Sequence, residues 1–504
     1  MKKQLVRNSF TGIIQTVIAV ILSFSVIPVF INLLGLREYG VFSTIMVIGN
    51  LNTFVNIGLA NALVKFLAEQ GKCDESDYDI VVTLGLTIII MLPFTLIAIV
   101  FNEFILLKIL NLPVENFTGI KFLYAAMLVS NFFLFIGQVF KSVLEARQKI
   151  DLNNYLQIFY NLVYWFFILA ILLLGYGLGE LGLAFFIASI TWFLLSLYYS
   201  SKYWGRLRLA GISRNYKRIV IKQLSYGMKI FTSSMIAFFY EPFTKILISH
   251  FIGVTEVGYY DIALRIRTNI WNLVTKGFAP LYPLLASMKD KDKIRLYIHD
   301  IEQKSFLVVL PIAIIVLFVT RPFISLWLGQ NIRIISDTTV PIVTAYLIAI
   351  TVVPLYIYLI ASGNAGKTII MQSANVFFNA LFFYITYPYF GYYAVVIGNV
   401  AAIASSYTIS IYYQKKLLES LVFDNFMQVI KLILIGCLIY LLGVGINFSV
   451  SSDIGRIFLH PTVIFFASIV FYRLFRVVSE DDVLRYAGGN ERLQRWGMRV
   501  FVRR

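Results

Sequence analysis

Charged and polar side chains recur along one face of the hydrophobic stretch at residues 258–286. Asp261, Arg265, Asn272 and Lys276 are separated by 4, 7 and 4 residues. A helix turns about 100° per residue, so this spacing places all four side chains on one face. Ionisable residues inside a hydrophobic span are costly and normally face a cavity or a partner. The pattern therefore predicts a polar site within this stretch.

A second group of charges lies in the preceding hydrophobic stretch, residues 226–249. Glu241 and Lys245 stand four residues apart and therefore share a helical face. One interpretation is structural: Glu241 pairs with Lys245, Asp261 pairs with Arg265, and both pairs only fix the packing. The other interpretation is functional, because cations outnumber the local acids and buried positive charge favours an anionic substrate. The cations that produce this excess are Arg265, Arg267 and Lys276.

Two stripes of amide side chains mark corresponding places in the two halves of the chain. Each member of the second stripe follows its counterpart by 218 positions, and the same offset relates Gly35 and Gly40 to Gly253 and Gly258. The chain is therefore predicted to contain two related halves. The amides either join neighbouring helices, at roughly 0.6 kcal/mol for each hydrogen bond, or line a polar cavity that binds sugar hydroxyls. The stripes are Asn154, Gln157 and Asn161, and Gln372, Asn375 and Asn379.

No arrangement typical of an enzyme accompanies these residues. The three histidines and two cysteines are scattered, and the sequence has no catalytic triad, zinc motif or phosphate-binding glycine loop. The predicted outside loops, of which 102–117 and 328–337 are the longest, are too short to form a catalytic domain. We therefore expect no enzyme activity, no metal and no cofactor. Glu241 and Asp261 are candidates for binding a coupling proton or sodium ion.

The composition indicates a membrane protein. Hydrophobic residues make up 59% of the 504 residues, charged residues only 14%, and the mean hydropathy is +0.80. A soluble domain has about 45–50% apolar and about 25% charged residues. A helix needs about 20 residues to cross the hydrocarbon core, and about 14 hydrophobic stretches reach that length. The predicted spans are 11–34, 41–64, 80–101, 119–140, 155–174, 181–199, 226–249, 258–286, 305–327, 338–361, 368–388, 391–413, 427–446 and 457–474.

We expect an all-α polytopic membrane protein with about 14 transmembrane helices. An even number of spans puts both termini on one side, and with that side cytoplasmic the basic residues lie mostly in inside segments, as the positive-inside rule requires. The net charge of +17 thus reflects topology, and nucleic-acid binding is not expected.

Arginines alternate with apolar residues near the C-terminus, which favours an amphipathic helix on the inner leaflet. The predicted organisation is an N-terminal six-helix bundle at 1–210, a pseudo-symmetric C-terminal six-helix bundle at 211–420, two additional helices at 421–475 and a basic cytoplasmic tail at 476–504.

Six short motifs follow one another along the chain: RNSF at 7–10, LLGLREYG at 33–40, NIGLANALVK at 56–65, LEARQK at 144–149, GVTEVGYY at 253–260 and LWLG at 326–329. In type and order they resemble the polysaccharide flippases of the Wzx type. Those flippases belong to the multidrug/oligosaccharidyl-lipid/polysaccharide exporter superfamily. The resemblance extends from about residue 5 to 420, and the last two spans match only in number and position.

The resemblance implies two six-helix bundles plus two helices, and alternating-access transport of an undecaprenyl-pyrophosphate-linked oligosaccharide across the cytoplasmic membrane. An O-antigen or other surface polysaccharide repeat unit is such a substrate. Implied partners are this substrate, membrane lipids, and polysaccharide polymerases or glycosyltransferases. The family has no single site motif to transfer, so the site residues rest on the charge argument: Arg265, Arg267 and Lys276 would attract the pyrophosphate, and Lys245, Glu241 and Asp261 would complete the cavity charge.

Other functions are left open by the sequence. A peptidoglycan-precursor exporter of the same superfamily also has 14 spans and a cationic cavity. A multidrug exporter usually has 12 spans and favours acidic cavity groups. A membrane glycosyltransferase or polymerase belongs to a different class, and it needs an activating base or a metal that the sequence does not offer.

Overall fold

The protein is helical throughout the part of the chain that the structure describes. The structure, a computed structural model, describes residues 2–49, 58–208, 212–275, 278, 281, 284–285, 288, 290–329, 333–419, 426–478, 480, 497 and 500. Within these ranges every regular element is an α-, 3-10 or π-helix, which confirms the predicted all-α class. The chain divides into two compact units, Met1–Asp261 and Ile262–Arg504.

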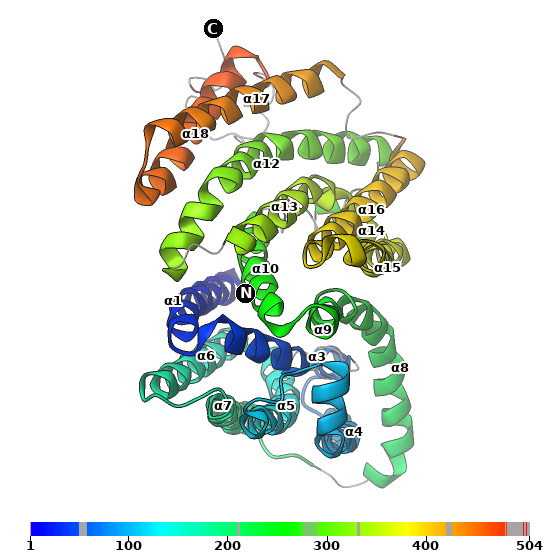
Figure 1. Ribbon diagram of the computed structural model, residues 1–504. Helices are drawn as coiled ribbons and strands as arrows, with labels where there is room; N and C mark the ends of the chain where they lie inside the picture. Colours follow the sequence, from blue (N-terminus) through cyan, green and yellow to red (C-terminus); the bar gives the residue numbers. More distant parts are fainter. Residues whose placement is uncertain are drawn as a thin grey trace. The chain divides into compact units, whose positions relative to one another are not determined.

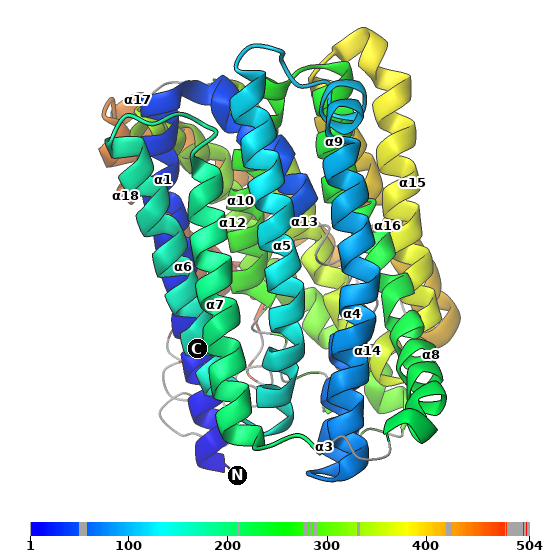
Figure 2. The ribbon, with the colours of Figure 1, turned by 90° about the horizontal axis from the view of Figure 1, so that it is seen from below.

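Unit 1 is a bundle in which α5 packs against α4 and α7, while α6 packs against α1 and α7. Figure 1 labels these helices, and Figure 2 shows α4, α5, α6 and α7 running side by side along their lengths. The elements of unit 1 are α1 (Lys2–Gly49), α3 (Leu59–Gln70), α4 (Asp74–Val100), η1 (Phe104–Ile109), α5 (Phe117–Ala146), α6 (Ile150–Leu173), α7 (Leu181–Trp204), α8 (Ile212–Phe238), α9 (Glu241–Phe251) and the first turns of α10 (Val254–Thr275).

Unit 2 contains the rest of α10 and a second set of long helices. Here α15 packs against α16, α13 packs against α12 and α16, and the last two helices both pack against α12. The elements are α12 (Lys291–Leu328), α13 (Arg333–Ala349), η3 (Ile350–Val352), α14 (Val353–Ala361), α15 (Ala365–Phe390), α16 (Tyr393–Leu418), α17 (Phe426–Ser449) and α18 (Asp453–Leu474).

Eleven helical segments among the described residues are long and apolar enough to cross a membrane. The protein is therefore a multi-pass membrane protein, but the predicted count of 14 spans is not confirmed. One difference in the count arises at the start, where the predicted span 11–34 and the first described residues of span 41–64, up to Gly49, form two helical parts of α1. These parts meet at Gly35, whose non-helical φ of 86° and ψ of 165° favour glycine.

The other difference lies between the predicted spans 226–249 and 258–286. The first of these is interrupted, because α8 ends at Phe238 and α9 begins at Glu241 with Pro242 in its first turn. Proline fits the first turn of a helix, where its missing N–H costs nothing. Neither helix is a candidate span. The predicted bundle boundaries at 210 and 420 stay predictions, and nearly all of the tail at 476–504 lies outside the described residues.

The repeated glycines bring α1 and the start of α10 into close contact. A Cβ atom added to Gly40 would lie 1.8 Å from the carbonyl oxygen of Val254, and one added to Gly258 would lie 3.2 Å from that of Leu36. Subtracting the offset of 218 from 254 and 258 gives 36 and 40. Gly40 therefore faces the residue equivalent to Leu36 in the other half, and Gly258, the equivalent of Gly40, faces Leu36 itself. Such a reciprocal pair of contacts is typical of an isologous two-fold interface. This reciprocity supports a structural origin for the sequence repeat.

We expect Gly40→Ala to destabilise the protein strongly, because α1 and α10 must separate to admit the new methyl group. Gly258→Ala should have a milder effect, since its nearest contact leaves more room. Thermal unfolding of the purified full-length variants in detergent measures both changes.

Gly85→Ala is the matched control, because a Cβ atom at this glycine of α4 meets nothing within 4 Å. Alanine exceeds glycine in helix propensity by about 1 kcal/mol, so Gly85→Ala should be neutral or stabilising. Equal unfolding temperatures for the Gly40 and Gly85 variants would contradict the close approach.

Candidate functional site

Two of the predicted site residues form a buried ion pair in unit 1. Lys245 of α9 and Asp261 of α10 are 7% and 5% exposed, and the Lys245 Nζ atom lies 2.5 Å from Asp261 Oδ1. The structural interpretation paired each of these residues with a neighbour on its own helix, Glu241 or Arg265. The structure shows a bond between helices, which ties α9 to α10.

Two hydroxyl groups of α1 complete this pair, and the sequence did not identify either of them. The hydroxyl of Tyr39 donates to Asp261 Oδ2 at 2.5 Å, and Lys245 donates to Ser43 Oγ at 3.1 Å. Tyr39 and Ser43 are buried and stand four residues apart, so they share one face of α1. The cluster of Tyr39, Ser43, Lys245 and Asp261 thus joins α9 to α1 and α10, the two helices that meet at the glycine contact.

The predicted cations have different surroundings. Arg267, which is 6% exposed, holds its guanidinium carbon 4.4 Å from the ring centre of Tyr346 on α13. Arg265 is half-buried on α10, and Asn272 is exposed. A buried guanidinium over an aromatic face is stabilised by the ring quadrupole. Lys276 lies outside the described residues.

The amide stripes differ between the two units. Asn154 of α6 donates to the carbonyl oxygen of Asn8 at 3.2 Å and to the hydroxyl of Thr11 at 2.8 Å, so it joins α6 to α1. Gln372 of α15 donates to the hydroxyl of Tyr356 at 2.8 Å. Within the described structure, the buried side-chain oxygens of Gln372 and Asn375 have no hydrogen-bond partner. Gln157 and Asn161 are half-buried, and Asn379 is buried.

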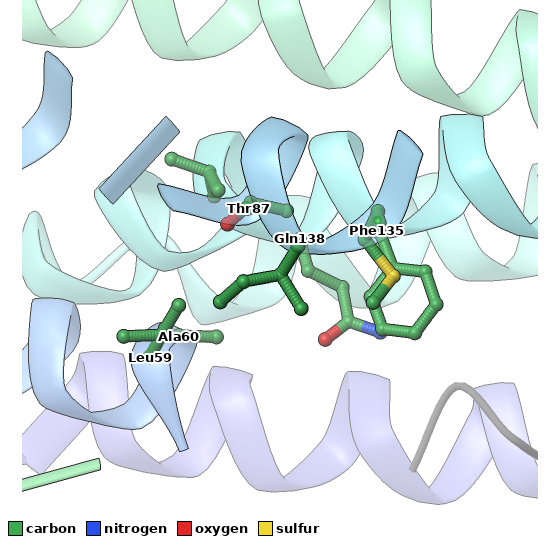
Figure 3. A pocket seen from close by; sticks show the side chains of 8 residues that line it. Leu59, Ala60, Thr87, Phe135 and Gln138 are labelled. Carbon is green, nitrogen blue, oxygen red and sulfur yellow. The ribbon is translucent and has the colours of Figure 1, made fainter. Parts of the chain in front are cut away.

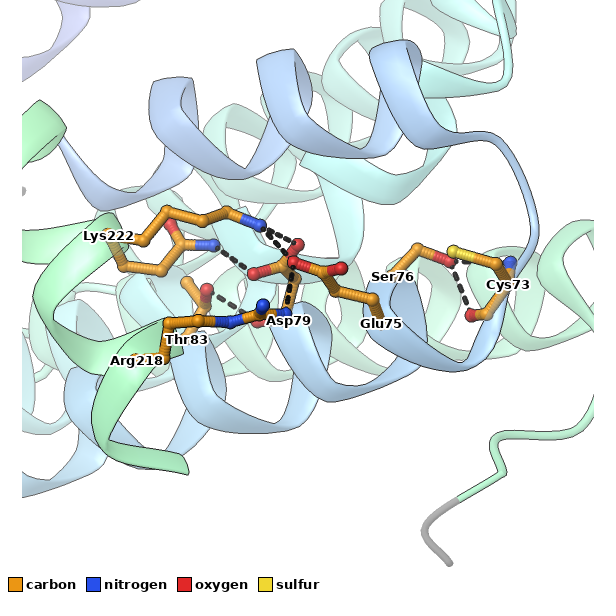
Figure 4. A network of polar contacts seen from close by, with 8 residues as sticks. Cys73, Glu75, Ser76, Asp79, Thr83, Arg218 and Lys222 are labelled. Carbon is orange, nitrogen blue, oxygen red and sulfur yellow. Dashed lines mark hydrogen bonds and ion pairs between the residues drawn. The ribbon is translucent and has the colours of Figure 1, made fainter. Parts of the chain in front are cut away.

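A network of charges holds α8 against the start of α4, as Figure 4 shows. Lys222 of α8 donates to Asp79 at 2.8 Å and to Glu75 at 3.3 Å, and Gln223 donates to Asp79 at 3.1 Å. Arg218 lies 3.2 Å from Glu75. Asp79 is fully buried, so its charge depends on these partners.

Asp77, two residues before Asp79 on α4, anchors the segment that follows α7. Its carboxylate accepts hydrogen bonds from Lys72 at 2.5 Å, Trp204 Nε1 at 2.6 Å and the backbone N–H of Arg208 at 2.9 Å. Asp77 is fully buried. Both carboxylates thus have structural partners, and their signal in the sequence was a set of closely spaced acidic residues before a hydrophobic span.

A small hollow of about 10 Å³, roughly the space of one water molecule, lies among α3, α4 and α5 (Figure 3). Its lining is mainly apolar, with Leu59, Met91 and Phe135, and its polar groups are Thr87 and Gln138. It offers no charge for an anion. No cluster of three or more His, Cys, Asp or Glu side chains within the described residues has the arrangement of a metal site.

Comparison with known proteins identifies the family. A family described as "Polysaccharide biosynthesis protein" matches residues 5–289, which is more than half of the chain. The chain belongs to this family. The family match confirms the resemblance found in the motifs. A comparison with curated proteins found no significant similarity.

Several solved structures of transporters have the same fold as this chain. A lipid II flippase MurJ in an inward closed conformation has a TM-score of 0.74 at 14% identity, over 95% of this chain and 100% of that chain. An outward-facing multidrug resistance MATE family transporter of the MOP superfamily has a TM-score of 0.57 at 15% identity, over 84% and 97%. The Vibrio cholerae MATE transporter VcmN in its bent form has a TM-score of 0.51 at 15% identity, over 83% and 97%.

The fold is therefore one that solved membrane transporters and flippases share. At these identities the structural similarity establishes the fold alone. Any inference about what the protein binds therefore has to rest on the residues of this chain.

The ion pair of Lys245 and Asp261 yields a prediction about stability. Lys245→Met or Asp261→Asn leaves the other residue as a buried charge without its partner, which costs roughly 3–5 kcal/mol. The double variant removes both charges and should recover part of that loss. Thermal unfolding of the two single variants and the double variant measures the interaction energy.

Arg333 and Asp337 are the matched control pair. They stand four residues apart on α13 at 3.3 Å, with side chains 74% and 37% exposed, and such a surface pair contributes less than about 1 kcal/mol. Single variants of Lys245 and Asp261 as stable as those of the control pair would show that the buried pair does not fix the packing.

Proposed function

We propose that the protein is a flippase for undecaprenyl-pyrophosphate-linked oligosaccharides, such as the repeat unit of an O-antigen or another surface polysaccharide. It would work by alternating access in the cytoplasmic membrane, with both termini on the cytoplasmic side. The observation that carries this proposal is the polysaccharide biosynthesis family match over residues 5–289, in a chain with an excess of cations within its apolar stretches.

The cations divide into two sets under this proposal. Lys245 is neutralised by Asp261 in the observed arrangement, so it contributes little attraction for an anion there. The pyrophosphate would instead be drawn to Arg265, Arg267 and Lys276. Arginine suits this role because its planar guanidinium donates two parallel hydrogen bonds to phosphate oxygens.

The glycan would be recognised by amides of unit 2. The unpartnered oxygens of Gln372 and Asn375 are buried acceptors within the described structure, and a sugar hydroxyl is a donor that would satisfy them. Asn154 already bonds to α1, which favours a packing role for that member of the first stripe. The polyprenyl tail needs no protein site because it remains soluble in the lipid.

A peptidoglycan precursor is the second candidate substrate. The MurJ fold match over nearly the whole of both chains favours it, and both candidate substrates are pyrophosphate-linked polyprenyl lipids. The test is transport in proteoliposomes that contain the full-length protein and a fluorescent lipid-linked substrate. The two lipids are compared with each other and with a cationic drug of the multidrug type. Transport of the drug alone would refute the proposal.

Substitution of the cations should abolish transport without removing the protein. Arg265→Ala and Lys276→Ala are expected to lose delivery of glycan to the cell surface at unchanged protein abundance, and Lys276→Arg should keep part of the activity because the charge remains. Surface glycan labelling and quantification of the membrane protein measure the two effects.

Arg333→Ala is the control, since this exposed arginine of α13 has an ordinary surface ion pair. It should transport normally. Loss of the protein itself in the Arg265 and Lys276 variants would assign these residues to packing instead.

A further inference from the structure

A buried carboxyl group in unit 2 has no role in the function proposed above. Glu302 of α12 and Gln414 of α16 are both fully buried, and Gln414 Nε2 donates to Glu302 Oε2 at 2.5 Å. This is a bond between two helices, and the two residues are 112 positions apart in the sequence. Glu302 precedes the predicted span 305–327 by three residues, so it lies near one end of that span.

The surroundings of Glu302 are largely apolar. A cluster containing Ile298, Leu355 and Leu418 lies around this part of α12, with Ile301 packed against it. No cation of the described chain lies within ion-pair distance of Glu302. The nearest charges on α12, Asp300 and Lys304, are paired with each other.

The titratable groups on the neighbouring elements also have their own contacts. His299 of α12 bonds to Gln303, the Tyr407 hydroxyl accepts a bond from Thr351, and the Tyr472 hydroxyl donates to the carbonyl oxygen of Leu307. Other titratable groups on these elements include Tyr297, His299, Asp300 and Lys304 of α12, Tyr356 and Tyr358 of α14, Lys367 of α15, Tyr407, Tyr412, Tyr413, Lys415 and Lys416 of α16, and Tyr472 of α18.

Two oxygen atoms of the Glu302–Gln414 pair are left without a donor. Glu302 Oε1 and Gln414 Oε1 are both buried and lack a hydrogen-bond partner within the described structure. A carboxylate offers only acceptors, and an isolated buried carboxylate is far more costly than a neutral polar group. A single hydrogen bond from an amide N–H is therefore not enough to stabilise the negative charge of an ionised Glu302 at this position.

A single proton would satisfy both oxygens. A carboxylic acid has one O–H donor, and an acid and a primary amide can form a cyclic pair in which N–H donates to the acid and O–H donates to the amide. We infer that Glu302 and Gln414 form a binding site for one exchangeable proton, which joins α12 to α16 as a neutral acid–amide pair.

A metal ion fits this place less well than a proton. Hard cations in proteins take about six or more oxygen ligands. The described chain offers two unpartnered oxygens at this site, both from the pair itself. A proton needs only one donor atom and one acceptor atom, which the pair provides.

Loss of the proton would weaken the contact between α12 and α16. The resulting carboxylate needs water, and water can reach it only if the two helices part. Proton exchange and helix separation are therefore one event at this site. Coupling of that event to substrate transport rests on the proposed flippase function, whereas the proton site itself does not.

Glu302→Gln tests the site directly, because an amide reproduces the shape of the protonated acid and keeps the cyclic pair. Infrared difference spectra of the full-length protein in lipid nanodiscs, recorded between neutral and alkaline buffers without substrate, should show loss of a protonated carboxyl C=O band in the wild type. The band should be absent from Glu302→Gln and retained in Asp300→Asn, the matched carboxyl control two residues away. Identical difference spectra for wild type and Glu302→Gln would overturn the proposal.

Unfolding as a function of pH gives a second readout. An exposed glutamate in the unfolded chain ionises near pH 4.3, so above that pH the native state would hold a proton that the unfolded state has lost. Stability then falls as the pH rises, with the folding equilibrium constant decreasing up to about tenfold per pH unit until Glu302 itself ionises. The Glu302→Gln variant should lack this component and Asp300→Asn should keep it; equal pH dependence in wild type and Glu302→Gln would contradict proton binding.

Two further measurements distinguish a proton site from a sodium site and link the site to transport. Stabilisation of the wild type by sodium over choline that disappears in Glu302→Gln would identify a metal site and overturn the proton assignment. In proteoliposomes, an imposed pH gradient should alter the transport rate of the wild type and leave that of Glu302→Gln unchanged. Failure of transport in both proteins would count against the proposed function, while the infrared titration would still decide the proton site.

Discussion

A charge buried among apolar helices must be neutralised by a partner, and this constraint determines much of the internal arrangement. Each buried carboxylate of unit 1 described above is neutralised by a different set of hydrogen-bond donors. Asp261 has a lysine and a tyrosine hydroxyl, Asp77 has a lysine, an indole and a backbone N–H, and Asp79 has a lysine and an amide. These bonds join separate elements rather than turns of one helix, because a buried ion loses water on every side and needs donors from several elements.

The sequence predicted the parts of the fold that depend on local patterns. Hydrophobic stretches indicated the helices of both units, and the 218-residue offset picked out Gly40 and Gly258, which the structure brings into one contact. The interruption after Phe238 was missed because apolar residues continue through it, and only Pro242 marks the new helix. The number of spans depends on such interruptions, which hydropathy alone does not resolve.

The pairing within the candidate site was harder to predict. Lys245 has Glu241 four residues before it, and a pattern based on one helix therefore favours that partner. Its observed partner Asp261 is 16 residues away on another helix, and Tyr39 is 222 residues from Asp261. Contacts of this kind depend on how helices are placed in space, which a single sequence does not specify. Glu302 was missed for the same reason, since the amide that donates to it lies on α16.

The reciprocal contact at Gly40 and Gly258 has a consequence for the history of the chain. Two copies of a shorter protein that carried only one half would each present the same glycine and the same facing backbone. They could then associate through this surface as a symmetric dimer, with both contacts identical. Fusion of two such genes would turn the interface between subunits into an interface within one chain. The paired glycines at positions 40 and 258 are what such an ancestor would leave behind, because neither half could replace its glycine without disturbing the other.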